Sequence, residues 1–195
     1  MKTARVGFAM CGSYCTFDKA ISALAELRGI YADITPIMSE SAYTTDTRFG
    51  AARDFARRAE ELCQKPVIHT ITDAEPIGPN ASLDILIIAP CTGGTLSKIA
   101  YGITDTCVTM AAKAHLRNGR PLLIAISTND ALGGAAPALA ALLGRRNVYF
   151  APFYQDDPVK KPTSLVADFA RLSAAAEAAL AGRQLQPLLA AAPGL

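Results

Sequence analysis

Residues 83–89 read "LDILIIA", an almost continuous apolar run, and the sequence "PCTGGTLSKIA" follows it directly. A strand that is apolar on both faces has to be covered on both sides, as a central strand of a parallel sheet is. The proline, hydroxyl residues and glycines that follow break the strand, and a helical pattern begins at once. This stretch therefore predicts a strand–turn–helix unit inside a layered α/β domain.

The same alternation of short apolar blocks with helical patterns runs along the chain. We expect strands over residues 4–10, 32–38, 83–89, 122–126 and 147–150, and helices over 18–27, 49–63, 95–101, 106–117, 137–143 and 165–181. Polar loops are expected over 39–47 and 151–164. Because parallel strands need crossover connections, the pattern predicts a Rossmann-like, three-layer α/β sandwich with a mostly parallel sheet. We expect one domain over residues 1–182 and a frayed C-terminal tail over 183–195.

The composition excludes several classes of protein. The 19 basic and 17 acidic residues give a net charge of +2, without the basic excess of a nucleic-acid binder. No apolar run approaches the roughly 18–20 residues that a membrane span requires. The five cysteines show no CxxC spacing and the chain has two histidines, so we expect no metal site. Free thiols are the expected state, as in a reducing cytoplasm.

Four loops follow expected strands, over residues 11–16, 39–47, 90–95 and 127–134, and all are rich in Ser, Thr, Asn or Gly. Ligands of such sheets bind outside the carboxyl ends of the strands. Hydroxyl groups donate hydrogen bonds to phosphate, and a turn of small residues that opens a helix suits an anion. Neither G-x-G-x-x-G nor G-x-x-x-x-G-K-[ST] occurs. The four loops together predict a phosphate-binding rim; the alternative is that βα loops are generically rich in these residues.

Several single residues are candidates for chemistry. Asn129 and Asp130 follow a strand, where a carboxylate can act on a substrate or form an Asx turn that caps the next helix. Arg48 is placed to bind a carboxylate with two hydrogen bonds, whereas a solvated helix face is the default role of Lys98. Cys91 ends a strand, where packing is the commoner role of a thiol.

The strings "GSYCT", "APCTGGTLSKIAYGITD" and "RPLLIAIS" resemble the flavoprotein superfamily, which includes phosphopantothenoylcysteine decarboxylase and flavin prenyltransferase. Within it, the chain looks closer to the family of dipicolinate synthase B subunits. That similarity rests on "TDTRFG", "AEPIGP", "MAAKAHLRNGRPLLIAISTNDALG", "YFAPFYQDDPVKKPTSLVA" and "QLQPLL", which are spread over nearly the whole chain. The resemblance implies a flavoprotein-type fold and an assembly of three or more copies.

The resemblance also implies an FMN site. Gly12, Ser13 and Ser39 would contact the phosphate, and Ser127 and Thr128 would lie near the ring. The rest of the cradle would be Thr92, Gly93, Gly94 and Thr95.

The family's reaction removes a hydride and a proton from dihydrodipicolinate during sporulation, and it forms the pyridine ring of dipicolinate. The resemblance implies a partner, the A subunit of the synthase, that carries NADP, and a location in the cytoplasm of the mother cell. From loop position, we expect Arg48 or Lys98 to pair with a substrate carboxylate and Asn129 or Asp130 to orient the ring.

Two alternatives stay open. One is a stand-alone FMN-dependent decarboxylase or prenyltransferase, although the chain lacks the Pro-Ala-Met-Asn motif of the decarboxylases. Ser127 and Thr128 also replace the Arg-Glu pair of the prenyltransferase. The other alternative is a non-catalytic protein that supports the assembly of its partner.

Overall fold

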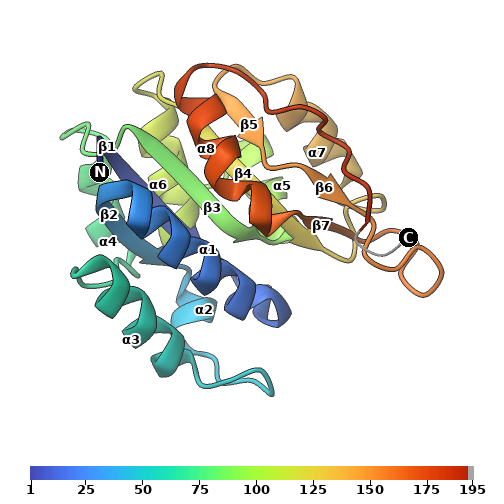
Figure 1. Cartoon of the computed structure of the whole chain (residues 1–195), viewed down its shortest axis with the longest axis horizontal. Helices are drawn as coiled ribbons and strands as arrows, with labels where there is room; N and C mark the ends of the chain where they lie inside the picture. The colour runs from blue at the N-terminus through green and yellow to red at the C-terminus, as the bar shows by residue number, and fades with distance from the viewer. Residues whose placement is uncertain (193–195) are drawn as a thin grey trace.

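The computed structural model describes residues 1–192, and within them seven strands form one sheet (Figure 1). The strands are β1 (Lys2–Met10), β2 (Tyr31–Met38), β3 (Ile85–Cys91), β4 (Leu122–Thr128), β5 (Val148–Phe150), β6 (Phe153–Tyr154) and β7 (Leu165–Ala167). Their order is β2-β1-β3-β4-β7-β6, with β5 also paired to β4. The β1–β2, β1–β3, β3–β4 and β4–β5 pairs are parallel, and β7 is antiparallel to β4 and β6. The expected mostly parallel α/β sheet is confirmed.

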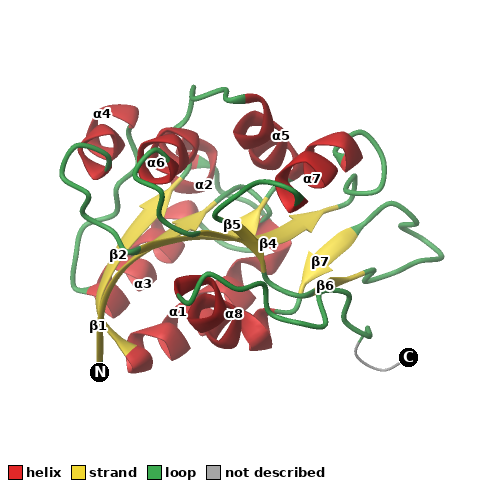
Figure 2. Cartoon of the chain, turned by 90° about the horizontal axis from the view of Figure 1, so that it is seen from above, coloured by secondary structure: helices red, strands yellow, loops and turns green. Residues whose placement is uncertain are grey.

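Helices cover both faces of this sheet (Figure 2). The α-helices are α1 (Phe17–Ile30), α2 (Glu40–Thr44), α3 (Ala52–Cys63), α4 (Ile71–Ala74), α5 (Gly93–Tyr101), α6 (Cys107–Leu116), α7 (Ala136–Leu143) and α8 (Leu172–Leu180). Short 3₁₀ turns span Tyr14–Thr16, Glu75–Ile77 and Phe169–Arg171. Helices α1, α3 and α8 pack on one face, and α4, α5, α6 and α7 pack on the other.

Strand β3 lies between the two apolar cores. Ile85 and Ile87 belong to the core under α1 and α8, whereas Leu86 and Ile88 belong to the core under α5 and α6. All four side chains are fully buried. Alternate side chains of a strand point to opposite faces, so a central strand covered on both faces has to be apolar at every position. The expected strand is therefore present, but it begins at Ile85 and ends at Cys91, two residues later at each end than the expected range 83–89.

The outer edge of β4 is shared by two strands of opposite direction. Its first half, from Leu122 to Ile124, pairs with β5 in parallel. Its end, Ser127 and Thr128, pairs with β7 in antiparallel fashion. The sheet therefore changes from parallel to antiparallel along one strand, next to the loop that follows β4.

The helix expected over residues 165–181 is wrong in its first part. Leu165 and Val166 pair with the end of β4, which commits their backbone to the sheet. Asp168 then accepts a hydrogen bond from the backbone N–H of Ala170 at 3.2 Å and opens the 3₁₀ turn that leads into α8. A strand of three apolar residues has no period of its own, so the pattern alone merged it with the helix.

The polar loop expected over 39–47 contains a helix. Ser39 caps α2 by accepting a hydrogen bond from the N–H of Ala42 at 3.3 Å. The loop continues beyond α2 to the start of α3 at Ala52, three residues later than expected.

The described part of the C-terminal segment is docked on the sheet edge rather than frayed. The Gln184 side chain accepts a hydrogen bond from the N–H of Phe150 at 2.8 Å and donates one to the Phe150 carbonyl at 2.7 Å. Further along, the N–H of Phe153 donates to the Leu188 carbonyl, and the N–H of Ala190 donates to the Phe153 carbonyl, both at 3.0 Å. Residues 184–190 thus pair with β5 and β6.

His115 of α6 is a buried structural residue. Its side chain is 1% exposed, and its Nε2–H donates a hydrogen bond to the Pro121 carbonyl at 2.9 Å. Burial disfavours the charged imidazolium and lowers the pKa of His115 from 6.5 to about 4.

This pKa shift predicts a pH dependence of stability. The unfolded chain binds a proton at His115 near pH 6.5 and the folded chain near pH 4, so stability is complete above pH 6.5 and falls as the pH drops toward 4. The loss from this group is up to about 3 kcal/mol. Urea unfolding between pH 7.5 and 4.5 measures it, with His115→Gln as the reference because its amide can also donate to Pro121. A stability difference between the two proteins that does not change with pH would contradict the prediction.

Candidate functional site

A cavity of about 540 Å³ lies at the carboxyl ends of the parallel strands. It is lined by Gly12, Tyr14, Ser39, Glu40, Ser41, Thr92, Gly94, Thr95, Lys98, Asp105 and Thr106. These residues follow β1, β2 and β3 or belong to the connection from α5 to α6. The cavity thus brings together three of the four loops that the sequence predicted to form a rim.

Helix α5 begins in the cavity wall. Thr92 caps it by accepting a hydrogen bond from the Thr95 N–H at 3.2 Å, and its hydroxyl donates to the Thr95 hydroxyl at 3.1 Å. The first N–H groups of a helix have no partner within the helix, and its N-terminus carries partial positive charge. The first turn of α5 has no acidic residue to offset that charge. A Cβ atom at Gly94 would meet nothing within 4 Å, so an anion has room to approach the backbone there.

The opposite wall comes from the loops after β1 and β2. The N–H of Ser39 donates to the Met10 carbonyl at 2.9 Å, which ties the two loops together. The Tyr14 hydroxyl donates to the Ser41 carbonyl at 3.1 Å, and the Ser39 and Ser41 hydroxyls are 3.2 Å apart. This wall is therefore rich in hydroxyl groups and is held in place by contacts between loops.

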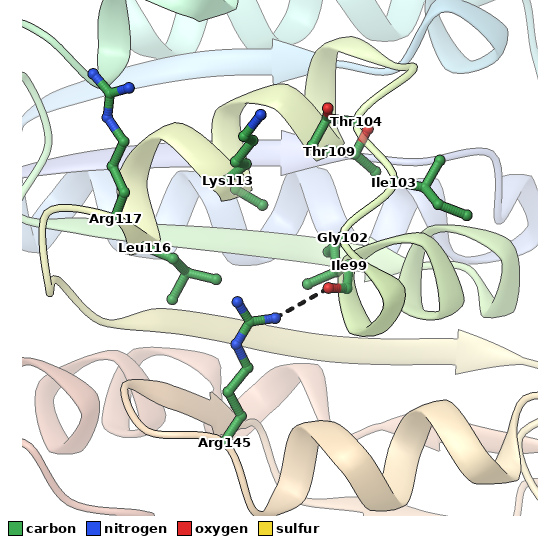
Figure 3. Close-up of a pocket in the computed structure, with 10 residues that line it drawn as sticks. Ile99, Gly102, Ile103, Thr104, Thr109, Lys113, Leu116, Arg117 and Arg145 are labelled. Atoms are coloured by element: carbon green, nitrogen blue, oxygen red, sulfur yellow. Dashed lines mark hydrogen bonds between the residues drawn. The ribbon is translucent and has the colours of Figure 1, made fainter.

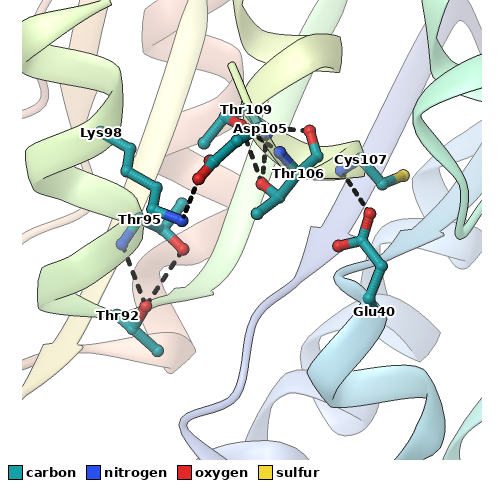
Figure 4. A network of polar contacts seen from close by, with 8 residues as sticks. All are labelled: Glu40, Thr92, Thr95, Lys98, Asp105, Thr106, Cys107 and Thr109. Carbon is teal, nitrogen blue, oxygen red and sulfur yellow. Dashed lines mark hydrogen bonds and ion pairs between the residues drawn. The ribbon is translucent and has the colours of Figure 1, made fainter. Parts of the chain in front are cut away.

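Charged residues at the cavity form two separate contacts (Figure 4). The Lys98 ammonium pairs with the Asp105 carboxylate at 2.9 Å, next to the start of α5. Across the cavity, Oε1 of Glu40 accepts a hydrogen bond from the N–H of Cys107 at 3.0 Å, at the first residue of α6. Glu40 lies on α2 and thereby joins α2 to α6.

Four of the expected cofactor residues lie outside the cavity lining. The Ser13 and Ser127 hydroxyls are 2.8 Å apart and connect the loop after β1 with the end of β4. A Cβ atom at Gly93 would come within 2.8 Å of the Thr128 hydroxyl, so Gly93 allows α5 to start close to β4. These residues hold the loops against one another.

The loop after β4 and the turn at Arg48 also lie outside the lining of the rim cavity. The Asp130 carboxylate accepts a hydrogen bond from the N–H of Gly134 at 2.9 Å, and the Asn129 carbonyl accepts one from the Thr163 hydroxyl at 2.7 Å. The Asp130 side chain is thus engaged within its own loop, and it does not cap α7, whose N-cap is Ala135 without a side-chain cap. Arg48 is exposed and its guanidinium lies 4.9 Å from the centroid of the Phe49 ring.

Five lining residues were not expected from the sequence: Tyr14, Glu40, Ser41, Asp105 and Thr106. Asp105 closes the "YGITD" string that resembles the flavoproteins, so it carried a local signal. Glu40 lies in the loop over 39–47 that was expected at the rim, but no pattern singled it out, because its contact with the start of α6 depends on the packing of α2.

The buried thiols around the rim are not nucleophiles. Burial raises the pKa of Cys11 to about 11 and that of Cys107 to about 12, and it raises the pKa of Cys91 well above its usual value. Thiols react as thiolates, so these three are inert at neutral pH. Packing is therefore the role of Cys91.

A second hollow of about 220 Å³ lies between α5 and α6 (Figure 3). Arg145 closes one side by donating a hydrogen bond to the Ile99 carbonyl at 3.1 Å. None of its lining residues belongs to a loop at the end of a strand. The rim cavity is accordingly the candidate site.

Within residues 1–192, no three His, Cys, Asp or Glu side chains gather in a way that could hold a metal ion. No helix in the same range is long and apolar enough to span a bilayer.

The fold and the rim together define an α/β protein of the flavoprotein type, and comparison with known proteins agrees. The model of the family described as Flavoprotein matches residues 1–152. A crystal structure of a dodecameric FMN-dependent Ubix-like decarboxylase from Escherichia coli O157:H7 superimposes with a TM-score of 0.58 at 25% identity. It covers 71% of this chain and 75% of that one.

A more specific similarity covers nearly the whole chain. The B subunit of dipicolinate synthase from Bacillus subtilis (strain 168) is 43% identical over 189 residues, which are 97% of this chain and 94% of the relative. The crystal structure of the dipicolinate synthase B subunit from Bacillus halodurans C gives a TM-score of 0.89 at 41% identity, with 97% of each chain covered. The chain therefore belongs to the flavoprotein family and, within it, to the dipicolinate synthase B subunits.

The exposure of the thiols predicts their reactivity. Cys15 is exposed, whereas the other four cysteines are buried. With iodoacetamide at pH 7.5, we expect one adduct per native chain, on Cys15, and almost none on a Cys15→Ser variant. Peptide mass spectrometry measures both. Modification of Cys91 at a rate comparable to Cys15 would contradict the burial and the raised pKa of its thiol.

Proposed function

We propose that the chain works as the B subunit of a dipicolinate synthase and that, together with the A subunit, it oxidises dihydrodipicolinate to dipicolinate. The observation that supports this most is the 43% identity to the Bacillus subtilis relative over almost the whole of both chains. The rim cavity supplies a place for the chemistry, because its hydroxyl groups and its lysine suit an anionic ligand.

FMN is the cofactor that the residues of the cavity fit. Its phosphate would bind at the start of α5, where Thr92 and Thr95 supply hydroxyl groups and the backbone at Gly94 is open to an approaching anion. Gly12 and Ser39 would complete the cradle from the opposite wall. When bound, the flavin supplies a two-electron acceptor.

Lys98 has a role toward the substrate. Its ammonium lies in the cavity wall and is paired with Asp105, so an incoming carboxylate competes with Asp105 for it. A dicarboxylate ring beside the cofactor would be oriented by this contact. Asp130 and Arg48, which lie outside the cavity, have no part in this proposal.

NADP belongs to the A subunit in this proposal. The present chain has no G-x-G-x-x-G fingerprint, which the binding of a dinucleotide on a Rossmann unit normally uses. The A subunit would bring the nicotinamide, and this chain would hold the ring. We further propose an assembly of several copies in the cytoplasm of a sporulating mother cell.

A pair of variants at Gly94 tests the cofactor site. Gly94→Asp places a carboxylate in the cradle without a steric clash, because a side chain there meets open space. An acidic residue in the first turn favours a helix, so the fold is retained. We expect affinity for FMN, measured by quenching of flavin fluorescence, to fall by more than about tenfold, or about 1.4 kcal/mol.

Gly94→Asn is the matched control, because it has nearly the same shape without the charge. Both side chains fill the same space, so we expect Gly94→Asn to bind FMN clearly more tightly than Gly94→Asp. Equal binding by Gly94→Asp and Gly94→Asn would exclude this cradle as the phosphate site.

The partnership with the A subunit has its own assay. The A subunit without this chain and the A subunit with it are compared with dihydrodipicolinate and NADP, and dipicolinate is measured by its ultraviolet absorbance. We expect product formation to require both proteins. Full activity of the A subunit without this chain would leave this chain with a supporting role in assembly.

A further inference from the structure

Glu40 is a carboxylate inside the rim cavity that the proposed function has not used. It occupies the first turn of α2 and lines the cavity together with Ser39 and Ser41. Its Oε1 atom is held by the N–H of Cys107 at 3.0 Å. The side chain is therefore fixed in direction by one oxygen, while the other oxygen is not used in that contact (Figure 4).

The other acidic groups near the rim are already engaged. Asp105 pairs with Lys98 at 2.9 Å, and Asp130 binds the N–H of Gly134 in its own loop. Glu40, in contrast, has no lysine or arginine within ion-pair distance in the part of the chain that the structure describes. It is thus the lining carboxylate whose charge no cation neutralises.

The cavity consequently has two electrically different ends. One end has the start of α5 and the ammonium of Lys98, and it suits a phosphate or a carboxylate. The other end has Glu40, whose carboxylate has no lysine or arginine partner among the described residues. The contact with Cys107 accounts for the placement of the side chain, and its unpaired charge at the cavity makes it available to a bound ring.

We propose that Glu40 is the catalytic base that takes the ring proton when dihydrodipicolinate becomes aromatic. The inference rests on the proposed function. In the reaction, one C–H bond of the ring breaks and its electron pair leaves as hydride, with an NADP-type oxidant as the final electron acceptor. A second C–H bond breaks, its electrons enter the ring to complete the aromatic system, and its proton binds to a Glu40 oxygen.

The contact with Cys107 contributes to this role. It holds the carboxylate at the wall while leaving the second oxygen for the proton, which is the arrangement that a general base needs. After transfer, the neutral acid still accepts the Cys107 N–H through its carbonyl oxygen, so the start of α6 keeps its partner.

Glu40→Gln separates this role from that of a helix cap. The glutamine amide oxygen still accepts the Cys107 N–H, but the side chain cannot take a proton at neutral pH. With the A subunit present, we expect the rate of dipicolinate formation to fall about 10²- to 10⁴-fold, the usual contribution of a general base. Removing the negative charge leaves FMN affinity unchanged or tighter.

Glu26→Gln is the control for loss of a carboxylate, because Glu26 is exposed on α1 away from the rim. It should keep the wild-type rate. FMN binding by fluorescence and the midpoint of thermal unfolding are measured on all three proteins, so that loss of fold or cofactor is seen directly.

Two outcomes overturn the role of Glu40. One is a Glu40→Gln rate within about threefold of the wild type while FMN binding is intact. The other is a rate that falls only together with FMN binding or stability, which would make Glu40 a structural cap. A wild-type chain that neither binds FMN nor accelerates the reaction of its partner would overturn the proposed function, and the role of Glu40 with it.

Discussion

Parallel pairing of β1 with both β2 and β3 brings the three strand-end loops of the rim cavity together. In this register Met10 is opposite Met38, so the loops that begin at Cys11 and Ser39 leave the sheet side by side. The end of β3 joins them on the other side of β1. Residues more than fifty positions apart, such as Ser39 and Thr92, thus meet at one cavity. The two apolar cores stabilise this register, because a slip of one residue would turn buried side chains to the opposite face.

The sequence contained enough information for the central part of the fold. Long apolar runs such as that of β3 and the helical periods of α1, α5 and α6 predict their elements, because each follows from local burial alone. The short elements were missed for the opposite reason. β7 is three residues long and exists because β4 and β6 hold it, and α2 depends on its cap at Ser39. Such elements are determined by contacts between distant segments, which a local pattern does not contain.

The residues of the candidate site also divide into those that the sequence predicted and those that depend on contacts between distant segments. Gly12, Ser39, Thr92, Gly94 and Thr95 were expected from the rule that ligands bind at strand ends, and they line the cavity. The rule is coarse, however, because it treats all strand-end loops alike. The loop after β4 has the same composition, yet β7 and Thr163 hold its backbone and Asp130 closes its turn. No pattern in the sequence singled out Glu40, because its contact with the start of α6 depends on how α2 meets α6.

The way in which Gln184 meets β5 bears on how this chain should be handled. Its side chain satisfies both the N–H and the carbonyl of Phe150, so a single amide substitutes for a neighbouring strand along the open margin of the sheet. A truncation at residue 182 would expose the N–H and the carbonyl of Phe150, and an exposed sheet edge can pair with strands of other molecules. An affinity tag placed after Ala192 leaves the Gln184 contact in place, whereas a C-terminal truncation made for crystallisation removes it.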